Sequence, residues 1–123
     1  MILKLTREEC FFAVEHGEFA EEIRGKTPKT AIILTQSWCP QWTAMHRYLN
    51  EAEKKAHDAS IDLSIFFIEY DKESWFEEFM VFKENEFKNR EIPYVRYYQD
   101  GKCIKDSNFI SLHGFLGHLG INV

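Results

Sequence analysis

Two apolar stretches constrain the fold more than any other feature of the chain. Thr30-Ala31-Ile32-Ile33-Leu34 and Ile65-Phe66-Phe67-Ile68 show no alternation of polar and apolar side chains. A strand that is apolar on both faces has to be covered on both, as the central strands of parallel sheets are. The chain therefore predicts two central strands, over residues 30–35 and 61–70, with helices on both sides of their sheet.

Helical patterns lie before, between and after these strands. From residue 40 to about residue 57, apolar residues recur every three or four positions, which is the period of a helix with one buried face. Thr6 with Glu9, and Ser74 with Glu77, have the spacing of capping boxes, whose side chains accept the free amides of a helix start. We therefore expect one helix to begin after Thr6 and another after Ser74.

The last third of the chain predicts a hairpin and a closing helix. Asp100-Gly101 is typical of a tight hairpin turn and separates the β-rich residues 94–98 from residues 102–104. Apolar residues between 112 and 119 then lie on one helical face. The resulting order of helix, strand, helix, strand, helix, hairpin and helix indicates a single α/β domain over residues 1–123. We expect a three-layer sandwich with a central mixed sheet flanked by helices.

Composition argues against two classes of partner. The formal net charge of −5 disfavours binding to the phosphates of nucleic acids. No stretch approaches the roughly 18 apolar residues that a membrane helix needs, and residues 1–9 lack the apolar segment of a signal peptide. We therefore expect a cytoplasmic protein that binds neither nucleic acid nor membrane.

The three cysteines, Cys10, Cys39 and Cys103, lie far apart in the sequence. An odd number without close pairs does not indicate a disulfide framework or a zinc site. The histidines show no metal-binding spacing either, so we expect no metal and no cofactor. Cys39 is distinguished by its position directly before Pro40, where a helix is expected to follow the first central strand.

Three short motifs, in this order along nearly the whole chain, resemble the thioredoxin family. Trp38-Cys39 at the start of a helix is similar to the beginning of the family's Cys-x-x-Cys motif. Ile92-Pro93 corresponds to the family's cis-proline, and Gln99-Asp100-Gly101-Lys102 to its hairpin turn. The resemblance implies a thioredoxin-like fold, a cis bond before Pro93, and thiol-disulfide chemistry in cell redox homeostasis.

The chain departs from the family's pattern at two positions that serve the same half of the dithiol reaction. Trp42 stands where the resolving cysteine is expected. The family's buried acid, which helps to deprotonate that second thiol, is expected near Ile33, which is apolar. The resemblance therefore implies an atypical Cys-x-x-Trp protein with one active thiol.

Cys39 alone can still act as a nucleophile. Pro40 suits the first position of a helix, so Cys39 is expected to cap the helix, where free amides and the helix dipole stabilise a thiolate. The mixed disulfide that it forms then needs an outside thiol such as glutathione, because Cys10 and Cys103 are expected to be buried. We expect Cys39 to be partly exposed and to alkylate faster than the other two cysteines.

Two functions fit these observations. The first is a monothiol thiol-disulfide oxidoreductase that uses Cys39 on a protein disulfide or thiol substrate. The second is a redox-inactive thioredoxin-fold module that binds a protein. In both, the expected contact surface lies around Cys39 and consists of Trp38, Trp42, Ile92, Pro93 and Tyr94.

Overall fold

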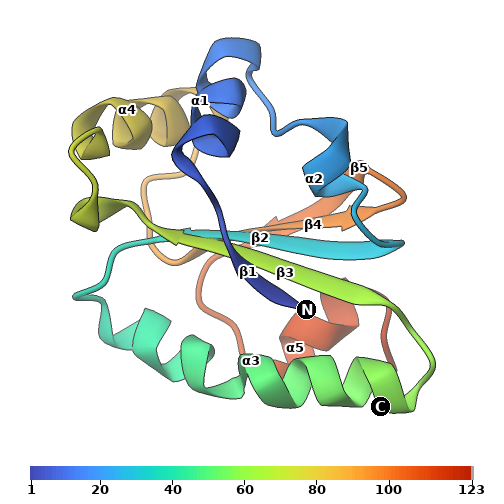
Figure 1. The fold of residues 1–123 in the computed structure, drawn as a ribbon. Coiled ribbons are helices and arrows are strands. Elements are labelled where there is room, and N and C mark those ends of the chain that lie inside the picture. Colours follow the sequence, from blue (N-terminus) through green and yellow to red (C-terminus); the bar gives the residue numbers. More distant parts are fainter. Residues whose placement is uncertain (123) are drawn as a thin grey trace.

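The computed structural model describes residues 1–122. Five strands form one mixed sheet in the order β1-β3-β2-β4-β5 (Figure 1). The strands are β1 (Ile2–Lys4), β2 (Lys29–Thr35), β3 (Leu63–Glu69), β4 (Tyr94–Gln99) and β5 (Lys102–Ser107). Strands β1 and β2 both pair in parallel with β3, whereas β4 pairs antiparallel with β2 and β5 antiparallel with β4. The mixed central sheet predicted from the sequence is therefore confirmed.

Helices cover both faces of this sheet, which gives the three expected layers. The helices are α1 (Arg7–His16), α2 (Glu21–Arg24), α3 (Pro40–Asp58), α4 (Phe76–Glu86) and α5 (Leu112–His118), and a short 3-10 helix η1 (Tyr70–Lys72) follows β3. In Figure 1, α1, α2 and α4 lie on one face of the sheet, and α3 and α5 lie on the other.

The apolar stretch in β2 is buried on both faces, as its composition predicted. Ile32 and Leu34 belong to the core beneath α1 and α4, while Ala31 and Ile33 belong to the core beneath α3 and α5. All four side chains are fully buried. Since successive side chains of a strand point to opposite faces, β2 contributes side chains to both cores.

The two expected capping boxes have different outcomes. At α1 the box is confirmed, since Thr6 Oγ1 accepts the Glu9 amide at 3.1 Å and Glu9 Oε1 accepts the Thr6 amide at 2.8 Å. The box at Ser74 is wrong, because α4 begins at Phe76 and is capped by Trp75 without a side-chain hydrogen bond. There the Phe76 amide bonds to the Glu73 carbonyl at 3.2 Å, so Ser74 lies inside a turn that continues from η1.

Strand β1 differs from the sequence prediction, whereas the hairpin agrees with it. The sequence order expected no strand before α1, yet Ile2–Lys4 pairs with β3, because three residues suffice for an edge strand but are too few for a visible pattern. The hairpin at Asp100 and Gly101 is confirmed, with φ values of 50° and 82°. Positive φ at both central residues is what a tight hairpin turn requires.

A polar network ties the loop after α1 to β4. Arg96 Nη2 lies 2.8 Å from Glu18 Oε2, and Arg96 Nε donates to the Tyr98 hydroxyl at 2.8 Å. The same hydroxyl donates to Glu18 Oε1 at 2.8 Å, and the guanidinium carbon lies 3.9 Å from the centroid of the Phe87 ring. Because the Arg96 side chain is only 14% exposed, its charge depends on the Glu18 carboxylate for compensation.

We therefore expect Glu18→Gln to destabilise the fold. The glutamine amide keeps one acceptor oxygen, but its NH2 group faces either Arg96 or the Tyr98 hydroxyl, and that donor then has no acceptor. An unsatisfied donor of this kind lowers the free energy of unfolding by about 1–3 kcal/mol. Urea unfolding measures this loss, with Glu22→Gln as the matched control, since Glu22 is an exposed carboxylate on α2. Equal midpoints for the two variants would contradict the role given to Glu18.

Candidate active site

Cys39 lies between β2 and α3 and forms the N-cap of α3, as expected. Its backbone is extended, with φ −75° and ψ 119°, and Pro40 occupies the first turn. The Cys39 amide bonds to the Gln36 carbonyl at 3.3 Å, and the Cys39 carbonyl accepts the Thr43 amide at 3.1 Å. The thiol is therefore placed at the start of a 19-residue helix, next to that helix's free amides.

The loop that carries Cys39 is fixed by the 3-10 helix η1, which follows β3, the strand next to β2. Asp71 accepts the Ser37 amide at 2.7 Å through Oδ1 and the Ser37 hydroxyl at 2.6 Å through Oδ2. The indole of Trp38 donates to Gln36 Oε1 at 2.6 Å. Sequence patterns gave no sign of the Asp71 contact, because Ser37 and Asp71 come together only through the pairing of β2 with β3.

The Cys39 thiol faces the segment that precedes β4. Its Sγ points at the Ile92 carbonyl oxygen at 3.8 Å, and the Ile92-Pro93 peptide bond is cis. Cys39 is only 5% exposed and packs in the core beneath α3, so the expectation of partial exposure is wrong. The reason is that the chain before Pro93 lies directly against the sulfur.

The other two cysteines also differ in exposure. All three cysteines are free thiols. Cys10 is fully buried in α1, as expected. Cys103 is exposed, contrary to expectation, because it belongs to the edge strand β5, in which nearly every residue is exposed.

Trp42 is a core residue and not part of an exposed binding surface. It is 1% exposed, and its ring stacks on His46 with ring centres 4.7 Å apart. Its Nε1 donates to Glu69 Oε2 at 2.8 Å, while Glu69 Oε1 lies 3.2 Å from Lys72 Nζ. Ile33 is apolar and fully buried, as expected, so it supplies no acid. The carboxylate of Glu69 instead lies against the side chain that replaces the second cysteine. Both Glu69 oxygens are already occupied, one by Trp42 and the other by Lys72.

The expected contact surface is only partly assembled around Cys39. Trp38 is 66% exposed, Ile92 is half-buried, and Pro93 is buried beside the thiol. Tyr94 is fully buried on the opposite side of the sheet, where its hydroxyl donates to Asp106 at 2.9 Å, so it is not available for contact. The alternation of β4 causes this, because Val95 faces the α3 core and Tyr94 therefore cannot.

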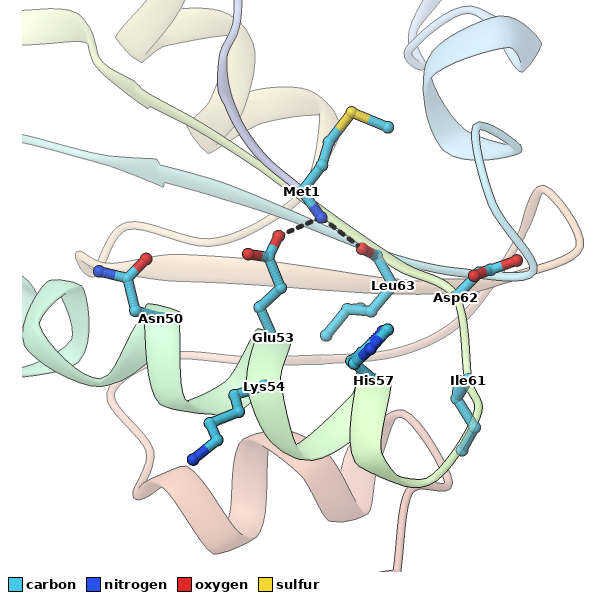
Figure 2. A pocket seen from close by; sticks show the side chains of 8 residues that line it. All are labelled: Met1, Asn50, Glu53, Lys54, His57, Ile61, Asp62 and Leu63. Atoms are coloured by element: carbon cyan, nitrogen blue, oxygen red, sulfur yellow. Dashed lines mark hydrogen bonds and ion pairs between the residues drawn. The ribbon is translucent and has the colours of Figure 1, made fainter.

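A separate cavity of ≈ 400 Å³ lies near the other end of α3. Figure 2 shows its lining, in which the Met1 amino group pairs with Glu53 and donates to the Leu63 carbonyl at 2.8 Å. At about 1.5 Å of rise per residue, Glu53 stands roughly 20 Å along α3 from Cys39. This cavity is therefore too distant to take part in chemistry at the thiol.

The described residues contain neither a metal-binding cluster nor a membrane-spanning helix. Between residues 1 and 122, no group of three or more His, Cys, Asp or Glu side chains is arranged to hold a metal ion. In the same range, no helix has the length and apolar character needed to span a membrane.

Known proteins resemble the chain in structure but not detectably in sequence. No protein-family model and no curated protein matches the sequence. Oxidised mitochondrial thioredoxin 3 from Saccharomyces cerevisiae superposes with a TM-score of 0.67 at 15% identity, over 97% of this chain and 93% of that chain. Oxidised thioredoxin O1 from Arabidopsis thaliana gives 0.66 at 11% identity, over 96% of each chain.

A glutaredoxin also resembles the structure. Buckwheat glutaredoxin, in its complex with glutathione, superposes with a TM-score of 0.54 at 16% identity, over 94% of this chain and 91% of that chain. The mixed five-stranded sheet with helices on both faces agrees with these likenesses. The chain therefore has the thioredoxin fold.

Proposed function

We propose that the chain is a monothiol thiol-disulfide oxidoreductase that contributes to redox homeostasis in the cytoplasm, with Cys39 as its nucleophile. The observation that supports this best is the position of the thiol. Cys39 caps α3, and its Sγ lies 3.8 Å from the carbonyl oxygen of Ile92, the residue before cis-Pro93. The sulfur thereby lies beside the backbone of the segment that precedes β4, where we propose that a substrate chain binds.

The proposed reaction begins at the thiol that caps α3. Its reactive form is the thiolate. The thiolate attacks one sulfur of a protein disulfide, a new disulfide forms between Cys39 and that sulfur, and the other sulfur leaves as a thiolate. This step consumes no electrons from outside, since one disulfide is exchanged for another.

Release of the substrate requires a second thiol from solution. Trp42 provides no sulfur, and the buried Cys10 lies in the core on the other side of the sheet. The thiolate of a small thiol such as glutathione attacks the Cys39 sulfur of the mixed disulfide, which releases the substrate sulfur as a thiolate and leaves glutathione bonded to Cys39. A second glutathione thiolate then attacks the glutathione sulfur of this adduct, so that glutathione disulfide forms and Cys39 leaves as a thiolate. The likeness to a glutaredoxin that binds glutathione supports this choice of reductant.

Trp38 is the proposed contact for the substrate protein. Its indole is 66% exposed, and Trp38 directly precedes Cys39 in the chain. Ile92, which is half-buried and whose carbonyl oxygen lies 3.8 Å from Sγ, is proposed to bind the substrate backbone. The buried Pro93 is proposed to hold Ile92 in place. Trp42 and Tyr94 support this site from within the two cores.

A second candidate function is a redox-inactive module that binds a protein through Trp38. It is favoured by the burial of Cys39, which is 5% exposed, and by the indole of Trp42 in place of a second thiol. A module of this kind needs no reaction at Cys39. The two candidates therefore differ in whether a mixed disulfide forms at that residue.

Glutathione disulfide distinguishes these candidates in a Cys103→Ser background, which removes the exposed thiol. We expect a single glutathionyl adduct on Cys39, because one thiolate attacks and no neighbouring sulfur can displace the product. The adduct should persist in intact-mass spectra until reduced glutathione is added, and it should be absent in Cys39→Ser. Loss of the adduct without added thiol would show that another group resolves it, and no adduct at all would favour the binding module.

Trp42→Cys should restore part of a dithiol reaction. The new thiol stands one helical turn from Cys39, so the reduction of insulin disulfides should rise, though modestly because Glu69 is already bound by Lys72. Losing the packed indole should lower the free energy of unfolding by about 3–5 kcal/mol. Trp42→Ser is the matched control, since it removes the indole without adding sulfur, and equal activity in both variants would contradict a resolving role for the new cysteine.

A further inference from the structure

Lys83 is a charged side chain that lies inside the core. It belongs to α4 and is 1% exposed. Burial lowers the pKa of its ammonium to about 8, although the nearby carboxylates of Glu84 and Glu91 act in the opposite direction. A buried ammonium is costly unless its donors are satisfied, so the groups that it contacts are expected to depend on it.

The acceptors of Lys83 are backbone carbonyls of one loop. Its Nζ donates to the Asn89 carbonyl at 2.9 Å and to the Glu91 carbonyl at 2.8 Å, and it lies 5.6 Å from the centroid of the Tyr94 ring. We call residues 89–93 the cis-proline loop. Hydrogen bonds from a charged donor are stronger than those between neutral groups, so Lys83 holds this loop firmly from the α4 side.

Asn108, which directly follows β5, holds the same loop. Its Nδ2 donates to the Pro93 carbonyl at 3.0 Å and to Asn89 Oδ1 at 2.9 Å. Asn89 Nδ2 in turn donates to Asn108 Oδ1 at 3.0 Å, and Asn89 Oδ1 accepts the Glu91 amide at 3.0 Å. Every one of these bonds fixes the chain just before or at Pro93.

The cis-proline loop ends against the thiol. The Ile92 carbonyl oxygen is 3.8 Å from Cys39 Sγ, and Cys39 is 5% exposed. We propose that Lys83 and Asn108 latch the cis-proline loop over Cys39, so that a disulfide reaches the thiol only when this loop moves. The inference rests on the proposed function for its role, and it makes Lys83 a positioning residue that acts on Cys39 through the loop.

The three cysteines allow the latch to be tested in one molecule. Iodoacetamide labelling of each cysteine is followed over time by peptide mass spectrometry. Cys103 is exposed and reports the reactivity of the reagent. Cys10 is fully buried, and burial raises its pKa to about 12, so its labelling reports global unfolding. The labelling rate of Cys39 reports opening of the cis-proline loop.

Lys83→Met removes the donors while keeping a long side chain in the core. We expect Cys39 to label about ten-fold faster than in the wild type, because two charged hydrogen bonds to the loop are lost and local opening becomes easier. Cys103 should label at an unchanged rate and Cys10 should stay protected, a pattern that a general loss of stability does not produce. Lys88→Met is the matched control, since this exposed lysine beside the loop loses the same charge.

Unchanged labelling of Cys39 in Lys83→Met, with Cys10 protected, would overturn the latch. If Cys10 also labels, the Lys83→Met variant has unfolded, and the labelling of Cys39 in Asn108→Ala tests the latch in its place. Asn108 is half-buried, and its truncation leaves the Pro93 carbonyl without its donor. Faster labelling confined to Cys39 in that variant is expected, and an unchanged rate would overturn the latch.

Adduct formation with glutathione disulfide, measured on the same variants, separates the latch from the proposed function. Faster alkylation of Cys39 without any mixed disulfide in wild type or variants would leave the latch standing and overturn the oxidoreductase. A mixed disulfide in the wild type with unchanged alkylation in Lys83→Met and Asn108→Ala would overturn the latch and leave the oxidoreductase standing.

Discussion

Burial of β2 on both faces is the constraint on which the rest of the structure depends. Ile32 and Leu34 require one layer of helices, and Ala31 and Ile33 require the other. A parallel partner for β2 then needs a crossover helix, and α3 provides it between β2 and β3. Cys39 therefore lies at the end of β2 because the sheet has to be covered, and not because of any contact made by its sulfur.

Polar contacts from three directions close the region around this thiol. Asp71 fixes the loop before Cys39, Glu69 fixes the indole of Trp42, and Lys83 fixes the chain before Pro93. The first two contacts join segments that are distant in the sequence, and the third joins α4 to the loop that follows it. The result is a single sulfur that is only 5% exposed, as the proposed latch requires.

The features predicted correctly from the sequence are those that local patterns determine. Helix periods, the capping box at Thr6 and the Asp100-Gly101 turn depend on neighbouring residues, and all were confirmed. The exposure of Cys39 could not be predicted in this way, since it depends on a contact with Ile92, 53 positions away. Tyr94 was predictable in principle, because strand alternation places it opposite Val95. Lys83 has the sequence signature of an ordinary surface lysine.

In the proposed function, Cys39 alone carries out disulfide exchange and depends on an external thiol. The rate of insulin disulfide reduction as a function of glutathione concentration, compared between the wild type and Cys39→Ser, tests this most directly. We expect a rate above background that rises with glutathione in the wild type, and the uncatalysed rate in Cys39→Ser. Equal rates for the two proteins at every glutathione concentration would contradict it.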